Sequence, residues 1–160
     1  MRNVWRSVLV VLVLSSVVAF GQTPSTGTTA PKDKALDLPL ERIDAVAREM
    51  AAKKVITQRL LGADNFSLNV RHIEGSEAPL QHEKIGDVWI VREGSGIAVT
   101  GGTLIDAKAT GTAGDMTGSG IRGGVERVVK AGDVVFIPPG LPHGIKESKS
   151  ITYLNVRLEP

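Results

Sequence analysis

Cysteine is absent from the 160-residue sequence. This absence excludes disulfide bonds and thiol chemistry, and it excludes a lipid attached to a cysteine behind an export signal. It permits an oxidising compartment without requiring one. The compartment therefore has to be inferred from the N-terminal segment.

An excess of charge of either sign is also lacking. The chain has 19 Lys and Arg against 17 Asp and Glu, and two of the basic residues, Arg2 and Arg6, lie at the extreme N-terminus. The residues after that segment carry 17 charges of each sign. Because nucleic acids and anionic membrane surfaces are bound through basic patches or runs, neither is expected as a partner.

An apolar run over residues 8–20 follows these two basic residues and ends beside the short side chains of Ala19 and Gly21. This layout is typical of a secretory signal peptide. The run is shorter than the about 20 residues that a membrane span needs. We expect residues 1–21 to be cleaved and the chain to be periplasmic or secreted; a membrane is a partner only if the leader stays in place.

The rest of the chain, roughly 140 residues, is enough for one domain with its own core and too short for two. Residues 22–36 are polar and rich in Pro, Ser and Thr, which predicts a flexible linker. The folded domain is expected over residues 37–160, with a helix over 37–53 and a barrel over 54–160.

The helix is predicted from its apolar period and from its first residues. Asp37 is a candidate cap, and Pro39 suits the first turn. Apolar residues then recur at helical spacing: Ile43, Val46, Ala47 and Met50.

After the helix, the sequence consists of short segments rich in β-branched residues and separated by Gly, Pro, Asn and Asp. Many short strands behind a single helix predict an all-β sandwich or barrel. The segments are residues 54–64, 66–75, 87–94, 95–105, 124–138, 143–148 and 151–160.

A glycine-dense region interrupts these strands over residues 101–124. Gly118, Gly120 and Gly123 match the spacing G-x-G-x-x-G of dinucleotide-binding proteins. That fingerprint requires a strand before it and a helix after it, and neither is predicted here. We interpret the region as a long flexible loop between strands, which would form a lid at the mouth of the barrel.

A histidine follows a rigid proline-rich turn in GDVVFIPPGLPHGIKE, residues 132–147. Gly132, Pro138, Gly140 and His143 reproduce the spacing G-x5-P-x-G-x2-H-x3-N as far as the histidine, and Glu147 stands at the final position. Such a turn takes the chain from one strand into the next with the imidazole aimed inward. This is the second signature motif of the cupin superfamily, and the chain resembles a small single-domain cupin.

The first cupin motif, G-x5-H-x-H-x3,4-E-x6-G, is present upstream in a degenerate form. Asp87 and Gly94 keep the spacing E-x6-G, with Asp in place of Glu. Gln81 and Glu83 occupy the two histidine positions, and His82 lies between them.

The resemblance implies a double-stranded β-helix, a jelly-roll barrel of roughly six to eight strands, behind the N-terminal helix. It also implies a divalent metal ion, Fe, Mn, Ni or Zn, at one mouth of the barrel. The implied ligands are His82, Asp87 and His143, with Glu83 and Gln81 as substitutes. Two imidazoles and one carboxylate leave open positions on such a metal for water or substrate.

Strand periodicity limits which of these residues share a face. Asp87 and Trp89 lie on the same face of their strand. His82 and Asp87 are an odd number of residues apart, so both point inward only if the chain turns between them. In a straight strand, Glu83 would share the face of Asp87 instead.

Each candidate has a structural alternative. His143 is either a ligand or an ordinary residue after a turn, His82 a ligand or an exposed loop residue, and Asp87 a ligand or a turn cap. His72 is either a strand residue at the rim or a further imidazole in the pocket. Trp89 is either barrel core or a platform for a substrate.

The expected function is that of an exported cupin whose metal acts on a small organic molecule, by dioxygenase, isomerase or lyase chemistry, with Glu83 as catalytic acid or base. The alternative is a non-enzymatic barrel that has lost its metal and binds a sugar or another small ligand. A homodimer through sheet edges is a further expectation. Arg71 and Arg157 are interpreted as solvated strand residues.

Overall fold

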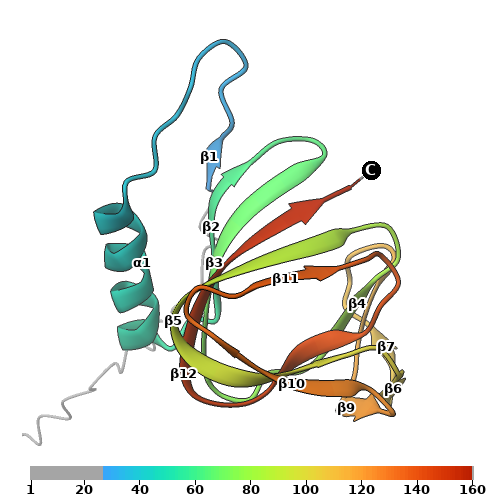
Figure 1. Cartoon of the computed structure of the whole chain (residues 1–160). Coiled ribbons are helices and arrows are strands. Elements are labelled where there is room, and N and C mark those ends of the chain that lie inside the picture. The colour runs from blue at the N-terminus through green and yellow to red at the C-terminus, as the bar shows by residue number, and fades with distance from the viewer. Residues whose placement is uncertain (1–26, 160) are drawn as a thin grey trace, which may run out of the picture.

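The structure is a computed structural model that describes residues 27–159 (Figure 1). The expected leader, residues 1–21, lies outside the described residues. Within the described range, no helix has the length and apolar character needed to cross a bilayer. In chain order, the elements are β1 (Thr28–Thr29), α1 (Leu40–Lys53), β2 (Thr57–Gly62), β3 (Phe66–Gly75), β4 (Leu80–His82), β5 (Gly86–Thr100), β6 (Thr103–Ile105), β7 (Lys108–Ala109), β8 (Asp115–Thr117), β9 (Gly120–Arg122), β10 (Val125–Lys130), β11 (Val134–Ile137) and β12 (His143–Leu158).

Two long strands, β5 and β12, build the barrel because each of them contributes to two facing layers (Figure 1). Most of β12 pairs antiparallel with β3, and its first residue pairs with β4. On its other edge β12 runs antiparallel to β5, which in turn pairs with β11 near its start and with β10 near its end. The predicted all-β barrel behind one helix is confirmed.

Each of these two strands had been predicted as two separate segments. The structure joins residues 87–94 to 95–100 in β5 and residues 143–148 to 151–158 in β12. Both strands bend near Gly94, where their register shifts between Ser148 and Ser150. Gly94 has a φ of 72°, and a Cβ there would collide with the carbonyl group of Ser150. Glycine therefore marks a bend here, where the sequence pattern indicated an end.

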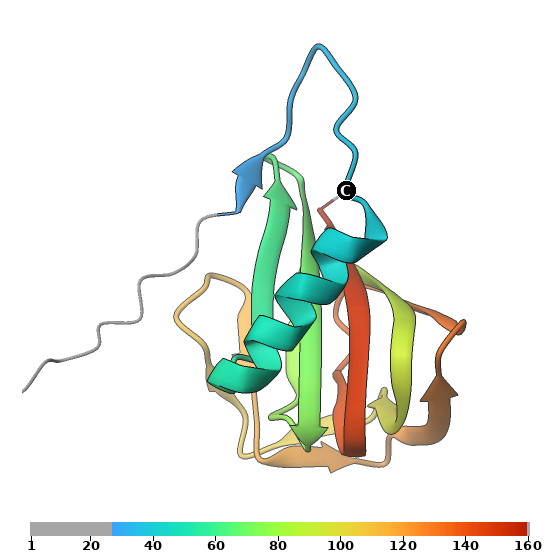
Figure 2. The ribbon, with the colours of Figure 1, turned by 90° about the vertical axis from the view of Figure 1, so that its left-hand side faces the viewer.

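The helix α1 lies across the outer face of the sheet formed by β2, β3 and β12 (Figure 2). It begins one residue after Pro39, which is the N-cap and makes no side-chain cap hydrogen bond, so the prediction that Asp37 caps the helix is wrong. Its end is set by Lys54 in the left-handed conformation. The face predicted to be apolar is buried at Ile43, Ala47 and Met50.

A separate core fills the interior of the barrel, on the other face of this sheet. Trp89 and Tyr153 are its largest members and lie 4.8 Å apart between ring centroids. The members are Ile73, Trp89, Val91, Ala98, Val129, Val135, Ile137, Ile145, Ile151 and Tyr153.

Two segments that were predicted as irregular contain strands. The glycine-dense region 101–124 includes β6 to β9: β6 pairs with β9, and β8 pairs with both β7 and β4. In the predicted linker, Thr28 and Thr29 form β1 and pair in parallel with β2. Backbone pairing orders both segments, and strands of two or three residues are too short to show an apolar period in the sequence.

Candidate metal centre

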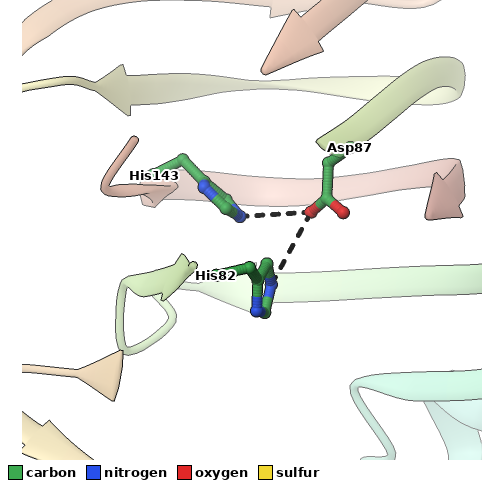
Figure 3. A group of neighbouring side chains, drawn as sticks. All are labelled: His82, Asp87 and His143. Carbon is green, nitrogen blue, oxygen red and sulfur yellow. Dashed lines mark ion pairs between the residues drawn. The ribbon is translucent and has the colours of Figure 1, made fainter. Parts of the chain in front are cut away.

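Three of the predicted ligands converge inside the barrel (Figure 3). One potential ligand atom from each of His82, Asp87 and His143 lies within 4.8 Å of the others. Asp87 Oδ2 is 3.1 Å from His143 Nε2 and 4.0 Å from His82 Nε2. All three residues are buried, so the alternative of an exposed loop residue does not describe His82.

The turn between β4 and β5 explains how His82 and Asp87 face the same point. β4 ends at His82, and β5 begins at Gly86. The interruption reverses the alternation of side chains, so that His82 is buried whereas Glu83 is exposed. This break explains how His82 and Asp87, an odd number of residues apart, both point inward.

The proline-rich turn holds His143 in place and fixes its ring. His143 Nδ1 lies 2.8 Å from the carbonyl oxygen of Leu141. Because a carbonyl oxygen only accepts hydrogen bonds, Nδ1 carries the proton and donates it. Nε2 therefore faces Asp87: it donates to the carboxylate when the ring carries both protons, and it offers a lone pair to a cation when the ring is neutral. The same turn contacts β4, since the Gly140 N–H donates to the His82 carbonyl at 2.6 Å.

His82 is oriented by a carboxylate that sequence reasoning missed. Its Nδ1 lies 2.7 Å from Asp115 Oδ1, an ion-pair contact in which the N–H is not well aligned with the oxygen. Asp115 begins β8 in the glycine-dense region, which was interpreted as a loop. A neighbouring carboxylate favours the proton on Nδ1 and leaves the lone pair on Nε2, which accepts from Arg157. Burial lowers the pKa of His82, and the charge of Arg157 adds to this effect, which favours the neutral imidazole that binds metals.

Arg157 also belongs to the site, and its interpretation as a solvated residue is wrong. Its guanidinium group contacts His82 Nε2, and its Nε is 3.5 Å from Asp87 Oδ1. The reason is the strand register, which places Arg157 directly opposite Asp87 across β12 and β5. Burial alone would raise the pKa of Asp87, but the hydrogen bond with His143 and the charge of Arg157 outweigh it and hold that pKa below its ordinary value.

Two buried oxygen atoms at this site have no hydrogen-bond donor among the described residues. They are Asp87 Oδ1 and Asn155 Oδ1. The other Asp87 oxygen accepts from Asn155 Nδ2 at 3.4 Å. A cavity of about 10 Å³ adjoins Asp87 and His143 and has room for about one water molecule or one ion. Two imidazole nitrogens, a carboxylate and a further oxygen atom without a donor are a donor set that fits a divalent first-row metal ion, which would take the place of the Arg157 contact with His82 Nε2.

The remaining predicted site residues lie outside the converging group, although Trp89 lines the cavity beside it. Glu83 is exposed and packs against Gly114, outside the converging group. Gln81 Nε2 donates to the carbonyl oxygen of Gly140 at 3.0 Å. His72 is on the outer face of β3, the face that α1 covers, and its Nδ1 is 2.9 Å from Thr152 Oγ1. Trp89 is barrel core, with its ring 5.8 Å from that of His143.

A second buried ion pair lies beside the site, and it corrects the interpretation of Arg71. Arg71 forms an ion pair with Glu77, whose other oxygen accepts from the Ile145 N–H at 2.9 Å and from the Tyr153 hydroxyl at 3.4 Å. The side chains of Arg71 and Glu77 are 11% and 5% exposed. Strand parity places Arg71 inside the barrel, as it does Asn69 and Ile73.

Comparisons with known proteins agree with this architecture. No protein-family model matches the chain, and no curated protein is significantly similar to it in sequence. Among solved structures, a protein of Bacillus halodurans superimposes with a TM-score of 0.50 at 14% identity, over 72% of this chain and 78% of that one.

Two further structures are similar at lower scores. An RmlC-like cupin with a double-stranded β-helix fold from Methanocaldococcus jannaschii gives a TM-score of 0.46 at 12% identity, over 65% of this chain and 79% of that one. A conserved protein with a double-stranded β-helix domain from Klebsiella pneumoniae gives 0.44 at 19% identity, over 65% and 76%. Identities this low concern the fold alone. By its strand topology and its two motifs, the chain has the double-stranded β-helix fold of the cupin superfamily.

Proposed function

We propose that this chain is an exported cupin that binds one divalent first-row metal ion through His82, Asp87 and His143 and acts there on a small organic molecule. One observation carries the proposal. Each imidazole has its Nδ1 beside an oxygen acceptor, and each directs its Nε2 toward the same carboxylate. Residues that only filled a core would not need two rings turned in the same sense.

The buried charges support a cation at this position. Three carboxylates, those of Glu77, Asp87 and Asp115, lie in or beside the site, against two guanidinium groups, those of Arg71 and Arg157. With neutral imidazoles, the group has an excess of negative charge in surroundings where unpaired charge is costly. A divalent ion would reverse the sign of this excess.

A metal held by three protein ligands supplies Lewis-acid or redox chemistry and keeps open positions for water or substrate. The protein's own contribution is to fix the two rings, to exclude bulk water from the buried carboxylate and to limit the space. Because the cavity is about 10 Å³, the body of a substrate has to lie toward the mouth of the barrel. Trp89 lines this cavity and is otherwise packed in the barrel core.

Metal analysis tests this proposal. The full-length chain is expressed with Fe, Mn, Ni and Zn supplied, purified without an affinity tag and analysed for metal per chain. We expect close to one equivalent in the wild type, a loss in His143→Ala and no change in His72→Ala, the matched control on the outer face. Substoichiometric metal in the wild type, or unchanged metal in His143→Ala, contradicts the proposal.

Export is tested on the same preparation. The intact mass is expected to show that the chain begins after Ala19 or Gly21. A chain that retains these residues contradicts the proposed cleavage and leaves the metal result unaffected.

A second candidate function is a barrel without metal that binds a small ligand, and the position of Arg157 favours it. The guanidinium group already contacts His82 Nε2 and Asp87, where a metal would be bound. In that case, the wild type contains no metal and Arg157→Gln acquires it. If the metal site is functional, the wild type is already loaded and Arg157→Gln changes the stoichiometry little.

A further inference from the structure

The two layers of the barrel end on one side at the strands β10 and β11 (Figure 1). β10 pairs with the end of β5 and β11 with its beginning, so these two strands lie in facing layers. In the described part of the chain, neither strand pairs with the other or with any strand except β5. Two strand edges without a partner therefore border this side of the barrel.

A groove of about 390 Å³ lies between these two strands, and we name it the edge groove. Its volume is within the range of sites that hold a small organic molecule. Val129 and Val135, which belong to the barrel core, form its floor. Its walls are apolar as well, because three large side chains there are 65–70% exposed: Val128, Val134 and Phe136.

Two charged residues, Arg127 and Asp133, complete the lining of the edge groove. Asp133 has a counterion: its Oδ2 accepts from the Lys130 N–H at 2.9 Å, and its Oδ1 is 3.7 Å from Lys130 Nζ. Arg127 shares its face of β10 with Val129 and is therefore directed inward. Its side chain donates to Thr100 Oγ1 at 3.2 Å and forms no ion pair with a carboxylate of the described residues. The edge groove thus has one positive charge without a counterion.

The strand register places the edge groove beside the candidate metal centre. Thr100, the partner of Arg127, lies directly opposite His143 across β5 and β12. In the facing layer, Val135 lies opposite Trp89, whose ring is 5.8 Å from that of His143. The groove is therefore one strand away from a candidate ligand, and it offers the space that the small cavity at the metal centre lacks.

We propose that the edge groove binds a small carboxylate with an apolar body. The carboxylate pairs with Arg127, because a guanidinium group matches its two oxygen atoms, and the body covers the walls at Val134 and Phe136. One cation without a counterion suits one negative charge, whereas a phosphate ester carries nearly two. A sugar would need polar partners for its hydroxyl groups, and the apolar walls do not offer them. That this carboxylate is the substrate of the metal centre rests on the proposed function; its binding in the groove does not.

Two probes of similar shape test the charge of the ligand. Phenylacetate carries a carboxylate, and phenylacetamide carries a neutral amide in its place. Each probe is titrated into the purified full-length chain, and its dissociation constant is obtained from the shifts of backbone amide signals in NMR spectra. We expect phenylacetate to bind about 10-fold or more tightly than phenylacetamide, which is the effect of a hydrogen bond between charged groups.

Arg127→Gln is expected to abolish the preference for phenylacetate and to leave the affinity for phenylacetamide unchanged. Arg92→Gln, which removes an exposed arginine of β5 outside the groove, is the matched control and is expected to keep the preference. Phe136→Ser is expected to weaken both probes alike because it shortens an apolar wall. Thermal melts identify any variant that is not folded, and Arg127→Met then replaces Arg127→Gln. A wild type that binds neither probe or binds both alike, an Arg127→Gln variant that keeps the preference, or a Phe136→Ser variant with unchanged affinities overturns the proposal.

The link between the groove and the metal centre is tested separately with Mn²⁺, a paramagnetic ion. We expect the protons of phenylacetate to relax faster in the presence of the Mn²⁺-loaded wild type than in the presence of His143→Ala at the same Mn²⁺ concentration. Equal relaxation overturns the assignment of the groove to the metal centre. A wild type that binds no metal contradicts the proposed function, whereas the preference for phenylacetate is expected to persist in it and in His143→Ala.

Discussion

At the scale of single residues, the chemistry of this barrel depends on the oxygen atoms that orient its two buried imidazole rings. The Leu141 carbonyl fixes the His143 ring, and the Asp115 carboxylate lies at the corresponding nitrogen of His82. Partners of this kind set both the direction and the basicity of a ligand. They are therefore expected to affect metal affinity almost as strongly as the ligands do.

We predict that Asp115→Asn lowers the metal affinity by about 10- to 100-fold, because a carboxylate beside a ligand histidine has an effect of this size. Competition with a chromophoric chelator measures the change. Glu83→Gln is the matched control: its carboxylate is exposed and packs beside Gly114, the residue before Asp115. If Asp115→Asn binds metal as tightly as Glu83→Gln does, the orienting role of Asp115 is wrong.

The places of Asp87 and His143 in the site were predictable because the motif spacing includes both, whereas His82 lies between two motif positions and was a candidate only by its closeness to them. Asp115 and Arg157 were not predictable, since each reaches the site through pairing between strands distant in sequence: β8 with β4, and β12 with β5. The only sequence signal for these two residues was the alternation of side chains along their strands. That alternation shows which residues share a face, but not which face points into the barrel. Glu83 shows the same limit of strand alternation. A straight strand would place it on the face of Asp87, but the turn between β4 and β5 leaves it exposed.

At the scale of elements, α1 is attached to the barrel only through its buried face. That face covers an apolar surface of the sheet, and Met50 is its most deeply buried residue, with 3% exposed. The helix was predictable from its period because its packing is one-sided. The continuity of β5 and β12 was not predictable. In the sequence, Gly94 indicates the end of a strand, whereas in the structure the strand bends there and continues.

We predict that Met50→Ala lowers the free energy of unfolding by about 2–5 kcal/mol, the range for truncating a buried large side chain. Urea denaturation measures this change. Glu49→Ala, on the exposed face of the same helix, is the control and is expected to leave the free energy of unfolding nearly unchanged. The metal content of the folded Met50→Ala protein should stay unchanged because α1 packs on the outer face; a loss of metal would show that the helix shapes the site.

At the scale of the whole molecule, stability depends on a phenol at the centre of the barrel. Burial raises the pKa of Tyr153 above its ordinary value of 10.0, and the neighbouring Glu77 carboxylate raises it further, while Arg71 opposes this. The unfolded chain loses this proton near the ordinary value, whereas the folded chain keeps it. Folding is therefore favoured fully below about pH 10 and less as the pH rises above that value.

We predict that the free energy of unfolding, measured in urea between about pH 9 and pH 11, decreases with pH more steeply in the wild type than in Tyr153→Phe. The variant has no phenolic proton to lose, although it also lacks the hydrogen bond to Glu77. Its stability is therefore lower at pH 9, and the two proteins approach each other as the pH rises. Parallel slopes would show that the phenol titrates alike in the folded and unfolded chains.

One carboxylate joins the two ends of a strand. Asp87 contacts His143, the first residue of β12, and Arg157, the residue before its last. Side chains from the two ends of β12 thus meet at one carboxylate, beside the proposed metal site. Opening either end of β12 would expose the same buried charge, so the fraying that frees most strand termini is expected to be suppressed at both ends of this one together.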